Sequence, residues 1–272
     1  MSLTIIKGKD LLDPSKLRLK MLVYALPGFG KTPFLGSACP NIGIAACETG
    51  HGRGTMSIAQ LDPELVFPDN FTEMRAITQG IKAGTIFGNK TAYGIDSLSY
   101  MANSFIKDEA LKVPRTKGNS EKRAMGVPEL DDYGTMGSLT RTLLHEILKL
   151  DKDILVTATL KIKEPSEDEP GGVTLIGPDL PGAMFAGSAA MFDIVMCGRT
   201  RTYLKDPRDA KSKVSERYWL TYGDGNYLVK CRCNNKGVPL LDREEPYDDT
   251  KGIGTFPLLK EKILQRYTAG MN

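Results

Sequence analysis

The sequence has few residues that could build a metal or disulfide framework. Its 272 residues include five cysteines and two histidines, and no two cysteines have the CxxC spacing. Zinc sites and disulfide scaffolds both require several such residues at short, regular spacings. We therefore expect reduced thiols, no zinc site and no disulfide scaffold.

Long apolar runs are missing as well. No stretch of about 18 apolar residues occurs, so we expect no membrane-spanning helix and no membrane partner. The first 20 residues lack the apolar core of a secretory signal, which together with reduced thiols predicts a cytoplasmic protein. The net charge of +3 singles out no partner, because nucleic-acid binding depends on where the charges cluster.

Short apolar runs alternate with helical patterns along the first two thirds of the chain. The apolar runs predict buried strands at 20–25, 42–48, 91–96, 153–159 and 192–198. Apolar residues that share one helical face predict helices at 97–111 and 138–150. Strands that alternate with helices imply an α/β fold with a mainly parallel sheet.

The rest of the chain shows three further patterns. Two polar stretches, 112–128 and 163–182, predict long loops. After residue 198 the runs RTRTYL, RYWLTY and YLVKCRC predict antiparallel strands on one edge of the sheet, and 256–267 predicts a closing helix. We expect a single domain over 1–272, with a core at about 18–200 and the added strands and helix at about 199–272.

A glycine-rich loop follows the first predicted strand. Residues 24–32 read YALPGFGKT, which fits the phosphate-binding pattern G-x-x-x-x-G-K-[ST] except that Ala25 replaces the first glycine. In this pattern backbone N–H groups cradle phosphates, the lysine reaches the β- and γ-phosphates, and the hydroxyl ligates Mg²⁺. A small alanine is compatible with the strand end if its φ is negative. The pattern predicts ATP and Mg²⁺ as cofactors, bound by Pro27, Gly28, Phe29, Gly30, Lys31 and Thr32.

Two acidic residues end later strands. Glu48 closes the run 42–48, and Asp96 closes the run 91–96. The carboxyl ends of parallel strands meet at one edge of a sheet, so both carboxylates are expected beside the loop. We predict that Asp96 holds Mg²⁺ together with Thr32, and that Glu48 polarises the attacking water. The alternatives are an Asp96 that caps the next helix and a Glu48 that is simply solvated.

Together these motifs resemble the RecA-like ATPase core. More narrowly, YALPGFGKT, CETG, YGIDSLSYM and GPDLPGAMFAGSAAMFDIVM are similar to small phage-encoded RecA-like nucleotide-binding proteins, some of which are single-strand annealing proteins of the Sak group. The resemblance covers about residues 18–240. It implies a RecA-like P-loop fold, an ATPase that acts on single-stranded DNA in phage recombination or annealing, and a location in the host cell cytoplasm. It also implies a homo-oligomer, either a ring or a filament, with a single-strand-binding protein as a further partner.

The resemblance also implies roles for particular residues. Lys31 and Thr32 match the P-loop pair, Glu48 the catalytic glutamate and Asp96 the acid on the metal side. At the end of ILVTATLK the family commonly has Gln or His as a sensor of the γ-phosphate, and this chain has Thr159, whose hydroxyl reaches less far.

The resemblance gives a further role to two basic residues in YLVKCRC. Lys230 and Arg232 have the i, i+2 spacing of a basic pair that reaches the γ-phosphate of the neighbouring subunit. Period-2 spacing puts both side chains on one face of a strand. The active site would then be completed between subunits. The alternative is an exposed basic strand face.

In RecA-like proteins two loops hold single-stranded DNA, and 112–128 and 161–180 correspond to them. The first stretch is basic and has no aromatic residue, which suits contact with phosphates better than base stacking. The second becomes acidic after Lys163. The predicted DNA contacts are Lys112, Arg115, Lys117, Lys122 and Arg123; the alternative is a solvated charged face.

A second function from another class fits the same residues. A nucleotide-dependent binding or assembly module would hold ATP, hydrolyse it slowly or not at all, and recruit a partner. Ala25 and Thr159 are the residues that favour this alternative. A small-molecule kinase has less support, because no acceptor-binding motif is recognisable.

Overall fold

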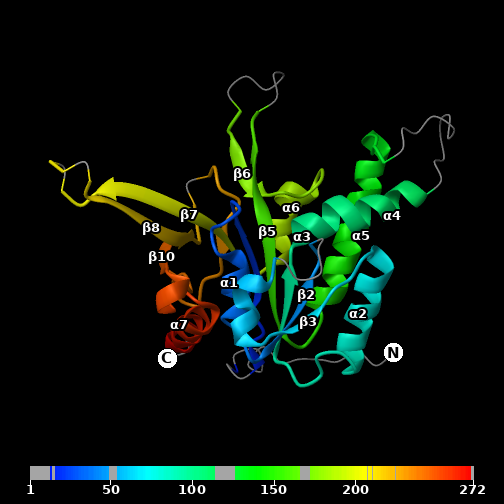
Figure 1. Ribbon diagram of the computed structural model, residues 1–272, viewed down its shortest axis with the longest axis horizontal. Coiled ribbons are helices and arrows are strands. Elements are labelled where there is room, and N and C mark those ends of the chain that lie inside the picture. Colours follow the sequence, from blue (N-terminus) through cyan, green and yellow to red (C-terminus); the bar gives the residue numbers. More distant parts are fainter. Residues whose placement is uncertain are drawn as a thin grey trace.

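A mainly parallel β-sheet runs through the protein, and helices cover both of its faces (Figure 1). The computed structural model describes residue 13 and residues 16–48, 54–113, 126–165, 172–206, 208–209, 211–223 and 225–270. In these residues the strand order is β10-β8-β7-β1-β5-β4-β2-β3, with β6 paired to β5 and β9 paired to β7. The strands are β1 (Lys20–Ala25), β2 (Ile42–Ala46), β3 (Glu64–Val66), β4 (Ala92–Asp96), β5 (Asp153–Lys163), β6 (Leu175–Pro178), β7 (Ile194–Leu204), β8 (Lys213–Leu220), β9 (Lys230–Cys231) and β10 (Glu244–Tyr247).

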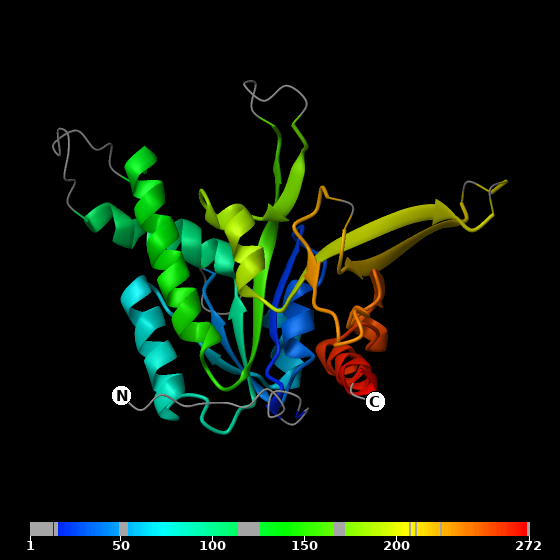
Figure 2. The same ribbon diagram turned by 180° about the vertical axis from the view of Figure 1, so that it is seen from behind.

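The helices form two layers. The α-helices are α1 (Lys31–Gly36), α2 (Phe71–Ala83), α3 (Leu98–Met101), α4 (Lys107–Lys112), α5 (Leu130–Leu148), α6 (Met184–Met191) and α7 (Phe256–Ala269); η3 (Met56–Leu61) and η6 (Asp249–Lys251) are 3-10 helices, and η4 (Ala102–Ile106) is a π-helical turn. One apolar core joins the sheet to α2 through α6, and a second joins it to α1, η3 and α7. Figure 2 shows the molecule from the side of α5 and α6.

Residue alternation on β1 explains how one strand serves both cores. Leu22 and Tyr24 point into the first core, and Met21 and Val23 point into the second, because successive side chains of a strand face opposite sides. All four side chains are buried. A strand covered on both faces is expected to be apolar throughout, as KMLVYA is.

The structure confirms the α/β class, the mainly parallel sheet and the antiparallel strands on one edge. β1, β2, β4 and β5 begin or end within a few residues of their predicted bounds, and α7 begins at the predicted residue 256. β7 runs without a break from Ile194 to Leu204, so the runs FDIVMCG and RTRTYL form one strand rather than two. The reason is pairing: after β1 ends, β7 continues along β8 from Cys197 to Leu204.

Two other predictions were wrong or incomplete, and some elements were not predicted at all. Stretch 163–182 was predicted as a loop, but Leu175–Pro178 forms β6, whose residues pair with the end of β5 (Ile162 opposite Ile176). α5 begins eight residues earlier than predicted, at Leu130, where Glu129 and Asp132 form a capping box. Helices α2 and α6 and strand β3 were not predicted. The first two errors arose at stretches rich in proline or glycine, where composition outweighed pairing and capping.

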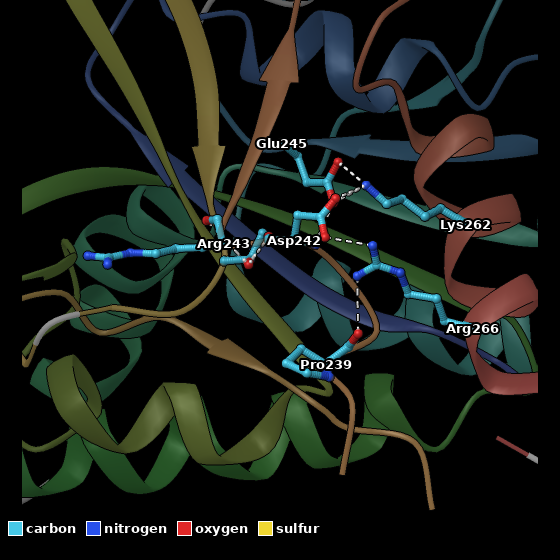
Figure 3. Close-up of polar contacts among 7 residues, drawn as sticks. Pro239, Asp242, Arg243, Glu245, Lys262 and Arg266 are labelled. Carbon is cyan, nitrogen blue, oxygen red and sulfur yellow. Dashed lines mark hydrogen bonds and ion pairs between the residues drawn. The ribbon is translucent and has the colours of Figure 1, made fainter. Parts of the chain in front are cut away.

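A charge cluster around the buried Glu245 fastens α7 to the edge of the sheet (Figure 3). Lys262 of α7 donates to both carboxylate oxygens of Glu245, at 2.7 and 2.8 Å, and Glu245 is only 5% exposed. Arg266, one turn further along α7, binds Asp242 at 2.6 Å and the carbonyl of Pro239 at 3.2 Å. β10 ends at Tyr247, and η6 begins two residues later at Asp249. The cluster therefore also fixes the position of Tyr247 and Asp249, which lie beside the glycine-rich loop.

A membrane-spanning helix must be both long and apolar. Among the described residues, none of the helices meets both conditions.

Candidate functional site

The glycine-rich loop lies between β1 and α1 and has the backbone that its glycines predict. Gly28 and Gly30 have φ angles of +78° and +112°, which side-chain-bearing residues rarely adopt. No described atom lies within 4 Å of the point where a side chain would begin on Gly28, so the space over the loop is open there. The Phe29 side chain between them is buried against Trp219 and Tyr247. The loop is therefore anchored by its aromatic residue and open at Gly28, whereas Tyr247 and Arg217 lie over Gly30, 2.9–3.1 Å from where its side chain would begin.

Ala25 fits at the strand end because the neighbouring strand supplies the missing space. Ala25 is fully buried, and Gly198 lies beside it on β7. A Cβ on Gly198 would lie 2.7 Å from Cβ of Ala25 and 2.6 Å from a ring carbon of Phe29. Alanine on β1 and glycine on β7 therefore form a matched pair beneath the loop.

This pair leads to a prediction about Gly198. The change Gly198→Ala is expected to push Phe29 outward, to lower the free energy of unfolding by about 1–3 kcal/mol, and to weaken binding of the nucleotide that the sequence predicts. The double variant Gly198→Ala/Ala25→Gly should regain part of both, because it removes one of the two clashes. Nucleotide titration and chemical denaturation measure the two effects.

Gly187→Ala is the matched control, because a Cβ at that α6 position meets nothing within 4 Å among the described residues. Unchanged nucleotide affinity in Gly198→Ala would show that the loop does not depend on this packing.

Thr32 and Asp96 meet at the head of α1. The Thr32 hydroxyl donates to Oδ2 of Asp96 at 2.6 Å, and the Thr157 hydroxyl donates to Oδ1 at 2.6 Å. Asp96 is only 6% exposed, so these two hydroxyls orient its carboxylate. Thr157, one strand away on β5, was not predicted; its inward position follows from burial of β5 on both faces.

Thr32 and Asp96 offer two oxygen ligands, which suits Mg²⁺ better than it suits a metal whose ligands all come from the protein. In the described part of the chain no group of three or more His, Cys, Asp or Glu side chains could hold a metal ion. Mg²⁺ is commonly bound by one or two protein oxygens, with phosphate oxygens and waters as the other ligands. Thr32 and Asp96 fit that pattern.

Glu48 and Lys31 add two further charges beside Thr32 and Asp96. Glu48 follows β2, and the Ser97 hydroxyl donates to its Oε1 at 3.4 Å. Partial burial raises the pKa of the Glu48 carboxyl, and the negative charge of Asp96 raises it further. The Lys31 ammonium donates to the carbonyls of Ala25 and Leu26 at 3.1 and 3.2 Å. Burial lowers the pKa of Lys31, and the charges of Asp96 and Glu48 oppose that shift.

These side chains share one cleft of about 470 Å³, which we call the loop cleft. Its wall includes Lys31, Thr32, Glu48, Asp96, Thr159 and Arg217. Thr159 lies opposite Ala25 on β5, between the loop strand and the Asp96 strand. Its backbone N–H donates to the Ser99 hydroxyl at 2.9 Å, and its carbonyl accepts from the N–H of Asp179 at 2.7 Å. The loop, the ends of β2 and β4, and Thr159 in the middle of β5 thus converge beside the end of β1.

The sequence did not predict that Arg217 lies at the loop. Its Nη1 donates to the carbonyl of Phe29 at 2.8 Å, across 188 residues of sequence, and its Nη2 pairs with Asp249. Its guanidinium lies 5.1 Å from the ring centre of Tyr247, whose hydroxyl donates to the carbonyl of Gly30 at 2.7 Å. Only the pairing of β7, β8 and β10 brings Arg217 over the loop. No local motif around Arg217 indicates that pairing, so the sequence could not place it there.

Lys230 and Arg232 lie elsewhere. Lys230 pairs with Val195 near the start of β7. The loop follows the other end of the neighbouring strand β1, so Lys230 lies towards the strand ends that face away from the loop. Its ammonium donates to the carbonyls of Ala189, Ala190 and Phe192, the last at 2.6 Å, while Nε of Arg232 binds Asp193 at 2.6 Å. β9 contains only Lys230 and Cys231, so the expected longer strand in YLVKCRC does not form. Within one chain, neither side chain reaches the loop cleft.

Of the predicted DNA contacts only Lys112 belongs to the described residues. It ends α4 and forms an ion pair with Glu109 at 2.9 Å. Arg115, Lys117, Lys122 and Arg123 lie outside the described residues.

Comparison with known proteins adds no functional information. The chain matches no protein-family model and no curated protein sequence.

Proposed function

We propose that the protein is a Mg²⁺-dependent P-loop ATPase of the RecA-like type. The observation that carries the proposal is the contact between Thr32 and Asp96 at the end of a glycine loop with two left-handed glycines. Lys31 and Glu48 line the same cleft. A hydroxyl, a carboxylate, an ammonium and a second acid are the groups that ATP hydrolysis requires of a protein.

Each residue has a definite task in this proposal. The backbone N–H groups from Gly28 to Lys31 bind the β- and γ-phosphates, and the Lys31 ammonium neutralises part of their charge. Thr32 and Asp96 hold Mg²⁺, which supplies further neutralisation of the phosphate oxygens. Glu48 accepts a hydrogen bond from the attacking water and orients it. Thr159 lines the cleft from β5.

The raised pKa of Glu48 fits the role of a base. Burial and the neighbouring Asp96 charge disfavour its ionised form, so the carboxylate binds a proton more readily than an ordinary glutamate does. A base is most effective when its pKa approaches the working pH. Lys31 has the opposite shift, but its charge is supported by Asp96 and Glu48.

The biological part of the proposal concerns DNA and assembly. Action on single-stranded DNA in phage recombination or annealing, a ring or filament of identical subunits, and a single-strand-binding partner all rest on the resemblance of YALPGFGKT, CETG and YGIDSLSYM to phage RecA-like proteins. Completion of the active site by Lys230 and Arg232 of a neighbouring subunit requires Arg232 to leave Asp193.

Steady-state ATP turnover tests the proposal, measured with and without Mg²⁺ and with and without single-stranded DNA. We expect turnover that requires Mg²⁺ and rises severalfold with DNA. Mg²⁺-dependent turnover that does not change with DNA would support the ATPase and contradict the proposed role in recombination. Binding of ATP with negligible turnover would favour the alternative, a nucleotide-dependent binding module. Absence of ATP binding would refute the site.

A further inference from the structure

A second cleft lies directly beside the loop cleft, and its shape follows from strand lengths. β1 ends at Ala25, opposite Thr159, whereas its two neighbours β5 and β7 continue to Lys163 and Leu204. Beyond β1, β5 pairs with β6 and β7 pairs with β8, and Figure 1 shows the two resulting arms diverging. The space between their bases is a cleft of about 500 Å³, which we call the arm cleft.

The arm cleft is continuous with the phosphate loop. Pro27, Gly28 and Arg217 line both the arm cleft and the loop cleft. A ligand bound by its phosphates along the loop could therefore extend past Gly28 into the arm cleft. The volume falls within the range of small-molecule sites, about 300–1,000 Å³.

The walls of the arm cleft are mostly apolar. Leu26, Leu160, Ile162 and Ile176 contribute aliphatic surface, and Leu26 and Ile162 are 60% and 58% exposed. Aliphatic side chains at such exposure beside a phosphate site leave apolar surface that a planar base can cover. Thr200 adds a hydroxyl from β7.

One cation in this cleft is available for a ligand. The Arg199 guanidinium lies 4.8 Å from the ring centre of Tyr227, and among the described residues it makes no hydrogen bond or ion pair. The next arginine on the same face of β7, Arg201, is engaged by Glu216 and Glu244. A guanidinium stacked on an aromatic ring is a surface on which nucleobases stack.

We infer that the arm cleft binds the nucleoside part of the nucleotide whose phosphates lie on the loop. The base packs between the aliphatic wall and the Arg199–Tyr227 pair, and Arg217 lies at the junction of nucleoside and phosphates. This inference rests on the proposed nucleotide site. It assigns to the arm cleft the choice between one nucleoside and another.

The experiment compares two ligands that share phosphates and differ in the nucleoside. ATP and inorganic tripolyphosphate are titrated against the native protein in the presence of Mg²⁺, and we expect ATP to bind at least about tenfold more tightly, the gain of one well-stacked base. The variant Thr200→Trp fills the cleft from an exposed position and should remove that advantage, leaving tripolyphosphate affinity within about twofold. Arg199→Ala should weaken ATP binding and spare tripolyphosphate.

Thr202→Trp is the matched control, because Thr202 lies two residues further along the same face of β7 and does not line the cleft. Equal affinity of the native protein for ATP and tripolyphosphate would overturn the inference and leave the phosphate site intact. Failure to bind either ligand would refute the phosphate site itself. A Thr200→Trp variant that binds ATP normally but loses a single-stranded oligonucleotide would assign the cleft to DNA and overturn the inference.

Discussion

Replacement of Lys31 by alanine is expected to reduce Mg²⁺-dependent ATP turnover by about 10²–10³-fold, the effect of removing one well-placed donor from a charged transition state. The Lys31 ammonium is the only lysine nitrogen among the residues lining the loop cleft that the structure describes. The carbonyls of Ala25, at the end of β1, and of Leu26 hold it at the loop, so its position is set before any ligand binds.

The fold should tolerate this change. Leu26 is 60% exposed, so water can replace the ammonium at its carbonyl. Thermal unfolding checks this point, and we expect a shift of only a few degrees. Lys82→Ala is the matched control, since Lys82 is an exposed lysine near the end of α2, away from the cleft. Full turnover in Lys31→Ala would mean that any measured activity arises outside this cleft.

The part of the site that could be predicted from sequence is the part specified by local pattern and strand direction. The glycines at 28 and 30 predict a left-handed backbone wherever the loop occurs. Glu48 and Asp96 end apolar strands, and parallel strands bring their carboxyl ends to one edge. Neither step requires knowledge of side-chain packing.

The rest of the site depends on contacts between distant segments. Gly198 accommodates Ala25 only because β7 lies beside β1, and Arg217 reaches Phe29 only because β8 folds back along β7. A single sequence carries no signal for such pairings unless a motif accompanies them. The i, i+2 spacing of Lys230 and Arg232 was a motif, yet spacing alone could not reveal that backbone carbonyls and Asp193 bind both side chains.

The same limit explains the errors in the fold. Strand β6 and the end of β5 are stabilised by pairing with each other. The composition of 163–182 carries no signal for this pairing, and its proline and glycine predicted a loop. In contrast, strands buried on both faces carry a continuous apolar signal, and β1 was predicted to the residue.

Arg217→Ala is expected to lower ATP turnover by about 10³-fold or more, the scale of an arginine that stabilises phosphoryl transfer. Arg217 reaches the cleft from its own chain, on a strand fixed by β7 and β10. It already donates to the loop at Phe29, and the pairing with Asp249 holds its second nitrogen. The planar guanidinium makes both contacts at once, so Arg217→Lys should not restore activity.

Loss of Arg217 also leaves the Asp249 carboxylate unpaired beside bound phosphates, and that repulsion alone could reduce turnover. The double variant Arg217→Ala/Asp249→Ala separates the two causes: it stays inactive if Arg217 acts on the phosphates, and it regains activity if the unpaired carboxylate is responsible. Asp249→Ala alone, with Arg217 retained, should keep most of the turnover.

Mixing experiments then decide which subunit supplies the arginine. If Arg217 acts within its own chain, inactive Arg217→Ala and Glu48→Gln proteins stay inactive when mixed, because no chain carries both residues. If Arg232 acts across an interface, mixed Arg232→Ala and Glu48→Gln proteins regain activity, because some interfaces join an intact Glu48 to an intact Arg232. The intramolecular contacts of Lys230 and Arg232, set against the position of Arg217 over the loop, favour the first outcome. Regained activity only in the Arg232 mixture, with full turnover in Arg217→Ala, would instead require Arg232 to break its bond to Asp193 when subunits assemble.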